Sequence, residues 1–319
     1  MSDKLFIVDA HEDIAYHMHY FSREFVCPSV PCQITLPGLK KGHIRLVFNT
    51  IFVHPKDKPS NTRKRALEQF GIYDEIYATY PEDVLRINDS SGISELLNGD
   101  KIGFLTLMEG ADPIHAPSDL EEFHAMGVRI IALAWNDKNR YASGTDTGEG
   151  LSAAGMELIE KMNDLNIVLD LSHLNEKCFW QAIDITASIP IASHSNSMSL
   201  CSHPRNLTDE QVTAVAEKGG VIGILLYSPF LNSGITRATL HDVFLHTDHM
   251  VRLVGEDHVG IGTDLDGAEI GAFPEEIQTV ADLPKIADTL RNNGYGEERV
   301  KKIMGENFIR VIRENFQRA

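Results

Sequence analysis

The chain has 319 residues, 43% of them hydrophobic, and its formal net charge is −17. This acidic balance argues against nucleic acid or an anionic membrane surface as the main partner. The sequence shows neither a secretory signal nor an apolar run of roughly 18 residues that could span a bilayer, so we expect a cytoplasmic protein. Its four cysteines form no CxxC zinc pattern and are expected to be reduced thiols. A homodimer or a higher homo-oligomer is compatible with this composition.

Apolar, β-branched runs recur along the chain and predict eight strands. They cover residues 5–11, 43–53, 101–110, 128–136, 166–173, 189–195, 220–228 and 258–267. Near-continuous apolar runs are typical of strands buried on both faces of a parallel sheet. Amphipathic stretches between them, at 62–80, 153–166, 208–220 and 281–294, predict helices. Within 208–220, Asp209 and Glu210 after Thr208 indicate the start of a helix, and Gly219 and Gly220 its end.

This alternation predicts an α/β fold, a (β/α)₈ TIM barrel in which residues 1–319 form a single domain. A doubly wound open sheet is the alternative, but no GxGxxG motif follows the first run.

Polar or ionisable side chains stand at the ends of most of the runs. In chain order they are His11 and Asp13, Glu109, Trp135 and Asn136, His173, His194, Tyr227, and Asp264. Active sites of these barrels lie at the C-terminal ends of the strands, so we expect these side chains to converge on one mouth.

The first two of these residues suggest a metal site. His11 and Asp13 are two residues apart, and side chains on a strand alternate with period two, so both should point to the same side. An imidazole and a carboxylate at this spacing suit a divalent metal such as zinc. For this pair alone, a solvent-exposed strand end remains the alternative.

The later residues strengthen the hypothesis of a metal site. Glu109 follows an apolar strand, where a buried carboxylate needs a cation or a partner. His173 and His194 end two further strands. Together with His11 and Asp13 these residues supply ligands for two metals, and Glu109 is the best-placed bridge. Asp264 is then a general base or a further ligand.

Longer segments resemble a known family, the membrane (renal-type) dipeptidases, peptidase family M19 of the amidohydrolase superfamily. The similar segments occur in the family order and cover nearly the whole chain. They are "DAHEDI", "LPGLKKGHIRLVFNTIF", "LMEGADPI", "GVRIIALAWNDKN", "VLDLSHLN", "ASHSNSMSLCSHPRNLTDEQ", "HVGIGTDLDG" and "GENFIRV".

The resemblance implies two Zn²⁺ per chain, one bound by His11 and Asp13 and the other by His173 and His194, with Glu109 bridging them. It places Asp264 as the catalytic aspartate beside a metal-bridging hydroxide. Arg205, in "HPRNLTD", matches the arginine that holds the free carboxylate of the substrate.

Two features depart from the mammalian members of the family. Their secretory signal and lipid anchor are absent here, so membrane attachment is not expected. Trp135 replaces their histidine after the fourth strand. An indole has one donor and cannot take up a proton, so we expect Trp135 to shape the pocket with its apolar face. Packing between barrel and helices is its alternative role.

We therefore predict a zinc-dependent dipeptidase that tolerates a D-residue at the C-terminal position. Asp264 and Glu109 would be catalytic, and Arg205, Trp135, Asn136 and Tyr227 would contact the substrate. One alternative is another amidohydrolase-type reaction on a lactone, ester or cyclic amide, which would not require Arg205. A non-catalytic scaffold is the other, but no ligand position is lost.

Overall fold

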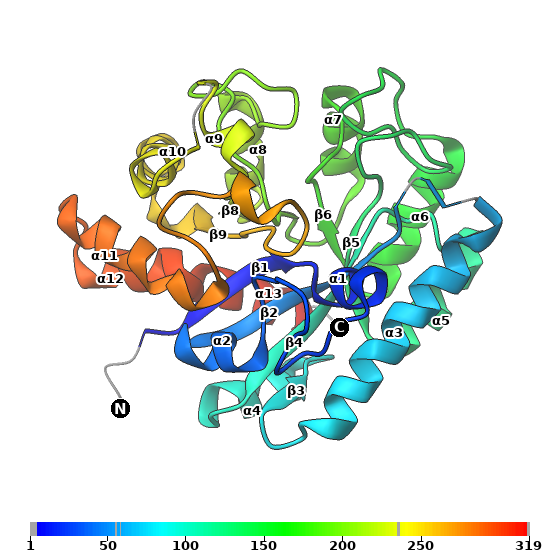
Figure 1. Ribbon diagram of the computed structural model, residues 1–319. Coiled ribbons are helices and arrows are strands. Elements are labelled where there is room, and N and C mark those ends of the chain that lie inside the picture. The colour runs from blue at the N-terminus through cyan, green and yellow to red at the C-terminus, as the bar shows by residue number, and fades with distance from the viewer. Residues whose placement is uncertain (1–4, 55, 58, 235–236, 318–319) are drawn as a thin grey trace.

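Eight parallel strands run around a nearly closed barrel, with helices outside it (Figure 1). The computed structural model describes residues 5–54, 56–57, 59–234 and 237–317. The strands in barrel order are β1 (Ile7–Glu12), β2 (Ile44–Phe52), β4 (Ile102–Glu109), β5 (Val128–Ala132), β6 (Val168–Asp170), β7 (Ile191–Ala192), β8 (Val221–Ile224) and β9 (Val259–Ile261). Seven of them lie within their predicted runs, and β1 extends one residue beyond its run, to Glu12, so the predicted TIM barrel is confirmed. That the whole chain is one domain stays a prediction.

A ninth strand, β3 (Val84–Arg86), was not predicted. It pairs in parallel with the first residues of β4, Ile102 to Phe104, whereas the pairing of β5 with β4 begins only at Thr106. The strand has three residues, which is too short for a periodic pattern to reveal it.

The helices cover the outside of the barrel. They are α1 (Ile14–Phe21), α2 (Leu36–Lys41), α3 (Thr62–Thr79), α4 (Ser90–Asn98), α5 (Leu120–Ala125), α6 (Ala153–Asp164), α7 (Glu176–Ile185), α8 (Asp209–Glu217), α9 (Ser228–Leu231), α10 (Leu240–Val254), α11 (Pro284–Asn292), α12 (Glu297–Lys301) and α13 (Asn307–Phe316). All four predicted helical stretches contain a helix. The N-cap of α8 is Thr208, whose hydroxyl accepts from the N–H of Gln211, and the chain leaves the helix through Gly219 at φ +81°.

Helix α13 closes the end of the barrel at which the strands begin. The ring of Phe308 lies 5.3 Å from that of Phe48 and packs into the apolar cluster formed by the strands. The Asn307 side chain donates to the carbonyl of Val259 at 2.7 Å, and that of Asn315 to the carbonyl of Ile189 at 3.0 Å. A ligand therefore has to enter from the opposite end.

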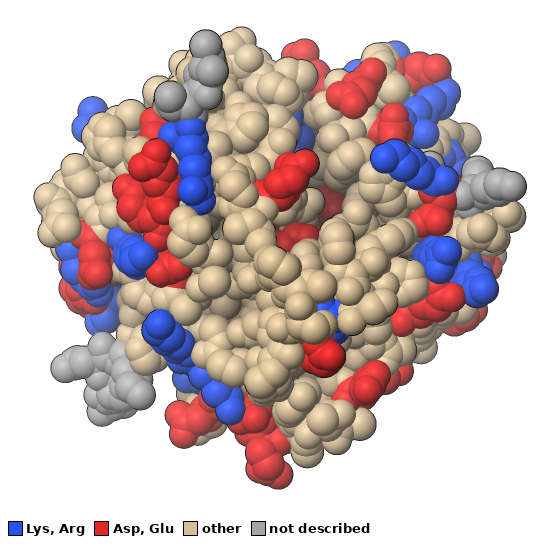
Figure 2. Space-filling view, viewed as in Figure 1, with Lys and Arg blue, Asp and Glu red and all other residues tan. Residues whose placement is uncertain are grey.

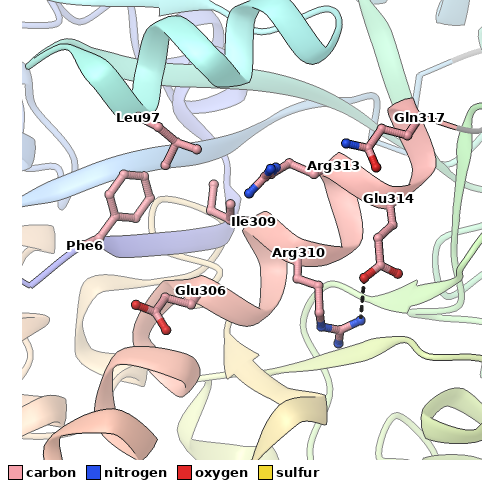
Figure 3. A pocket seen from close by; sticks show the side chains of 8 residues that line it. All are labelled: Phe6, Leu97, Glu306, Ile309, Arg310, Arg313, Glu314 and Gln317. Atoms are coloured by element: carbon pink, nitrogen blue, oxygen red, sulfur yellow. Dashed lines mark ion pairs between the residues drawn. The ribbon is translucent and has the colours of Figure 1, made fainter.

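A cavity of about 570 Å³ lies against α13, far from the ends of the strands where the predicted site residues stand. Figure 3 shows Phe6 and Leu97 facing the helix there, with Arg310 paired to Glu314. None of the predicted site residues lines it.

The first and last strands meet without a regular ladder. The N–H of Asp264 donates to the carbonyl of His11 at 3.0 Å, and the N–H of Asp13 to the carbonyl of Leu265 at 3.1 Å. The barrel is thus closed by the residues that follow β1 and β9. Among the described helices, none has the length and apolar character needed to cross a bilayer.

Candidate active site

Three histidines from three strand ends converge on the carboxylate of Glu109, the last residue of β4. Its Oε1 lies 2.9 Å from His173 Nε2, 3.4 Å from His194 Nε2 and 3.5 Å from His11 Nε2. All four side chains are buried. The structure therefore brings together four of the five predicted metal ligands, with the three histidines around one oxygen atom of Glu109.

Asp13 and Asp264 approach the same ring nitrogen of His11 as Glu109 does. Asp13 Oδ2 is 3.8 Å from His11 Nε2, and Asp264 Oδ1 is 4.0 Å from it. Thr50, which the sequence did not single out, donates its hydroxyl proton to Asp13 Oδ1 at 2.5 Å. This contact fixes one oxygen of Asp13 and leaves the other directed to His11.

Three groups of side chains could each hold a metal ion, and one of them, His11, Asp170 and His194, shares a histidine with each of the other two. His11, Asp13 and Asp264 can each place one ligand atom within 4.8 Å of the others, and so can Glu109, His173 and His194. These two groups meet where His11 faces Glu109. This arrangement matches two metal positions that share Glu109 between them.

An irregularity in β1 sets the direction of His11. Asp9 pairs with Val47 and Glu12 with Asn49, so three steps along β1 face two steps along β2. Such a bulge changes the alternation of side chains, and here Ala10 packs with the barrel interior while His11, next to it, reaches Glu109. His11 lies within the bulge and Asp13 follows the last residue of β1, yet the two side chains point to the same side, with Asp13 Oδ2 3.8 Å from His11 Nε2.

Two of the predicted residues have a backbone conformation that is uncommon outside glycine. His173 has φ +67° and Asp264 has φ +65°. Non-glycine residues in this left-handed region are costly and cluster at functional sites. Both residues follow their strands by three positions, and the turn directs their side chains back over the barrel.

The charges in the site favour a cation. Burial would lower the pKa of His11, but the carboxylates of Glu109, Asp13 and Asp264 outweigh it and raise this pKa to about 10. Burial would raise the pKa of Glu109, but the positive charge of His11 and the close contacts of His173 and His194 outweigh burial and hold this pKa well below its usual range.

The other two histidines are held in the neutral form. Burial, and then the charge of Arg205, lower the pKa of His173 to about 4. Burial and the charge of His11 lower the pKa of His194 well below its usual value. A neutral imidazole has the free lone pair that a metal requires.

The residues present fit a metal centre. Among the described residues His11 Nε2 is buried without a hydrogen-bond partner, although it points at three carboxylates. Imidazole nitrogens with carboxylate oxygens are a donor set that zinc and similar divalent ions take. His11, Asp13, Glu109, His173 and His194 could therefore hold such ions.

Asn136 lies against a metal-ligand candidate. Its Oδ1 is 2.7 Å from His173 Nδ1, and the hydroxyl of Thr145 donates to the same oxygen at 3.2 Å. The amide oxygen accepts from the Nδ1–H of His173, which leaves Nε2 free toward Glu109. The sequence suggested contact with substrate for Asn136, and nothing in its position pointed to this hydrogen bond.

The remaining predicted residues surround the mouth. The guanidinium of Arg205 is buried and donates to Ser195 Oγ at 3.0 Å and to the carbonyl of His194 at 2.7 Å. A cavity of about 170 Å³ is lined by Arg205 and His173, among others. The Trp135 ring is partly exposed and lies 6.0 Å from that of His173 and 5.5 Å from that of Phe52.

Tyr227 completes this set of residues on the side of Asp264. It is partly exposed, and its ring lies 4.9 Å from that of Phe230. Burial, followed by the charges of Glu269 and Asp264, raises its pKa. Figure 2 shows a hollow near the centre of this face, with acidic side chains inside it.

Comparisons with known proteins agree with this geometry. The model of the family described as membrane dipeptidase (peptidase family M19) matches residues 1–319. The chain belongs to this family. It is a metallo-dipeptidase, a hydrolase that acts on peptide bonds.

Relatives of the dipeptidase span most of its length. A Klebsiella pneumoniae protein described only as lying in the pqqA 5' region is 38% identical over 73% of this chain and 90% of its own. A crystal structure of dipeptidase AC, a family M19 metallopeptidase, has a TM-score of 0.93 at 27% identity and covers 98% of this chain and 99% of that one.

A second solved structure contains a ligand. It is a metallopeptidase from Rhodobacter sphaeroides bound to a phosphinate mimic of the dipeptide L-Ala-D-Ala. Its TM-score is 0.91 at 26% identity, and the alignment covers 97% of this chain and 99% of that one.

The close approach of Asp13 and Asp264 requires glycine at position 267. A Cβ atom there would clash with Asp13 Oδ2 and Asp264 Oδ1. We expect Gly267→Ala to displace both carboxylates and to lower metal content and kcat by more than 10-fold, because active-site displacements of about 1 Å cost up to 10²-fold. Metal analysis and steady-state kinetics measure both effects.

Gly271→Ala is the matched control, because a Cβ at Gly271 meets no atom within 4 Å. It should behave like the unmodified protein. Full metal content and activity in Gly267→Ala would contradict the requirement for a close approach.

Proposed function

We propose that this dipeptidase binds two Zn²⁺ ions and hydrolyses dipeptides, including those with a D-residue at the C-terminal position. The observation that carries the proposal is the convergence of three histidine Nε2 atoms within 3.5 Å of Glu109 Oε1. His11 and Asp13 would hold one ion, His173 and His194 the other, and Glu109 would bridge them. When bound, such ions supply a water acidic enough to attack near neutral pH and positive charge for the carbonyl oxygen.

We assign the transfer of the proton to Asp264. Burial and the charge of Glu109 raise the pKa of this carboxyl to about 6, against the opposing effects of His11 and Arg205. A group with a pKa near the working pH is suited to general base and acid catalysis. Asp264 would accept a proton from the attacking water at Oδ1 and pass it to the leaving amine.

Arg205 would bind the terminal carboxylate of the substrate. Ser195 and the carbonyl of His194 hold its guanidinium in place, and its Nε has no hydrogen-bond partner in the described part of the chain. A fixed guanidinium can offer two parallel N–H groups to a carboxylate. The partly exposed ring of Trp135 would form an apolar wall, and Tyr227 would stand on the side of Asp264.

The metal content is the first test of this proposal. We expect two divalent ions per chain in protein purified without chelators, because His11 with Asp13 and His173 with His194 belong to separate sets of ligand atoms. A chelator should abolish hydrolysis, and added Zn²⁺ should restore it. Elemental analysis measures the stoichiometry, and a value below one ion per chain would refute the proposed centre.

Asp264→Asn should lower kcat by about 10²–10⁴-fold, because an amide keeps the volume of the side chain but cannot accept the proton. Metal content should stay near that of the unmodified enzyme. Glu269→Gln, an exposed carboxylate on the same loop, is the control and should keep full activity. Near-normal turnover of Asp264→Asn would remove Asp264 from this role.

A panel of substrates tests the binding of the carboxylate and the tolerance of a D-residue. L-Ala-D-Ala and L-Ala-L-Ala should be hydrolysed at comparable rates, since the proposed contacts fix the carbonyl and the carboxylate rather than the C-terminal side chain. The corresponding C-terminal amides should react at least 10-fold more slowly, because they lack the charge that Arg205 would bind. Strict selectivity for the L,L form, or equal rates for acids and amides, would contradict these assignments.

A further inference from the structure

The hydroxyl of Ser193 lies between a metal-ligand candidate from each of the two groups. Ser193 Oγ is 2.7 Å from His194 Nδ1 and 3.3 Å from His11 Nδ1. It donates to Asp170 Oδ2 at 2.5 Å, and Ser193 is fully buried. One hydroxyl on the inner side of the site therefore joins both groups.

The number of donors and acceptors on a hydroxyl determines how these bonds run. A serine hydroxyl has one proton to donate and two lone pairs with which to accept. Asp170 takes the proton, because a carboxylate can only accept hydrogen bonds. Its other oxygen, Oδ1, accepts from the N–H groups of Ser172 and Ser193 at 3.0 and 2.9 Å. Both lone pairs then remain for N–H donors, and His194 and His11 supply them from Nδ1.

This direction of donation sets the orientation of the two rings. A ring that carries its hydrogen on Nδ1 leaves Nε2 for a metal, and both Nε2 atoms face Glu109, at 3.4 Å for His194 and 3.5 Å for His11. Ser172 Oγ lies 3.4 Å from Ser193 Oγ, which is the longest of these contacts of the Ser193 hydroxyl. It competes with His11 for one lone pair of Ser193 Oγ and leaves the bond from His194 in place.

We propose that Ser193, anchored by Asp170, is a positioning residue that holds one histidine ligand of each metal ion with its Nε2 toward the ion, and so affects both sites at once. The inference rests on the proposed function, because it requires two bound ions. His173 is outside this arrangement, since its Nδ1 is held by Asn136 at 2.7 Å.

Metal titration of the demetallated protein tests the shared role. Ser193→Ala removes the acceptor for both rings, and we expect the affinity for Zn²⁺ to fall about 10- to 100-fold in both binding steps, as for other residues that orient metal ligands. Ser193→Thr keeps a hydroxyl and should bind close to normally. Ser172→Ala is the matched control on the neighbouring hydroxyl and should leave both steps unchanged.

The outcomes separate this inference from the function on which it rests. If the unmodified protein binds fewer than two ions, the proposed function and the inference both fail. If it binds two and Ser193→Ala binds both as tightly, or loses affinity in one step only, the inference alone is overturned.

A second measurement needs no variant and covers the case in which Ser193→Ala does not fold. Long-range ¹H–¹⁵N correlation spectra of the zinc-loaded enzyme, labelled on histidine, report which ring nitrogen carries the hydrogen. His11 and His194 should both show a protonated Nδ1 and a metal-bound Nε2. A metal-bound Nδ1 on either ring would overturn the proposal.

Discussion

The burial of several charged groups at one end of an apolar barrel is the constraint on which this site depends. Asp13 and Glu109 are almost removed from solvent and Asp264 is partly so, and the buried guanidinium of Arg205 acts on Asp264 and Glu109 through its charge. An uncompensated buried charge costs several kcal/mol, so three carboxylates facing one guanidinium leave a demand for positive charge. In the protein alone His11 meets part of this demand, which is why its pKa rises to about 10. Divalent ions would meet it fully and return the imidazole to its neutral form.

The same residues close the barrel. Between β1 and β9 the backbone contacts are made by His11, Asp13, Asp264 and Leu265, three of which carry candidate ligand groups. Near these contacts Arg23 forms a buried ion pair with Asp266 at 2.5 Å. A metal ion bound between the first and last strands would therefore link the two edges of the sheet.

The sequence was sufficient to predict the barrel, and it placed the five ligand candidates at the ends of strands, because both inferences follow from local patterns. Long apolar runs identify the strands, and parallel strands carry their C-terminal residues to one mouth. The residues that hold these ligand side chains in place, or leave room for them, were not predictable in this way. Thr50, Ser193 and Gly267 are ordinary residue types, and they acquire their roles from distant partners. Ser193 and His11 are 182 positions apart in the chain, and Gly267 and Asp13 are farther apart still. The bulge in β1 is equally invisible in a sequence, since it depends on the register with β2.

Trp135 illustrates how the type of one residue limits what a site can contribute. A histidine at this place could donate to a developing negative charge and exchange a proton, whereas an indole can only donate from Nε1. The Trp135 ring continues an aromatic series from Tyr16 through Phe52, at ring distances of 5.2 and 5.5 Å, and ends beside His173. This apolar wall stands on the β1, β2 and β5 side of the mouth, and Arg205 follows β7 on the other. A dipeptide whose carboxylate is bound by Arg205 would thus extend its N-terminal residue toward aromatic rings. Recognition of the substrate and stabilisation of the reacting carbonyl would then fall to different groups, the first to the aromatic wall and Arg205, the second to the metal centre.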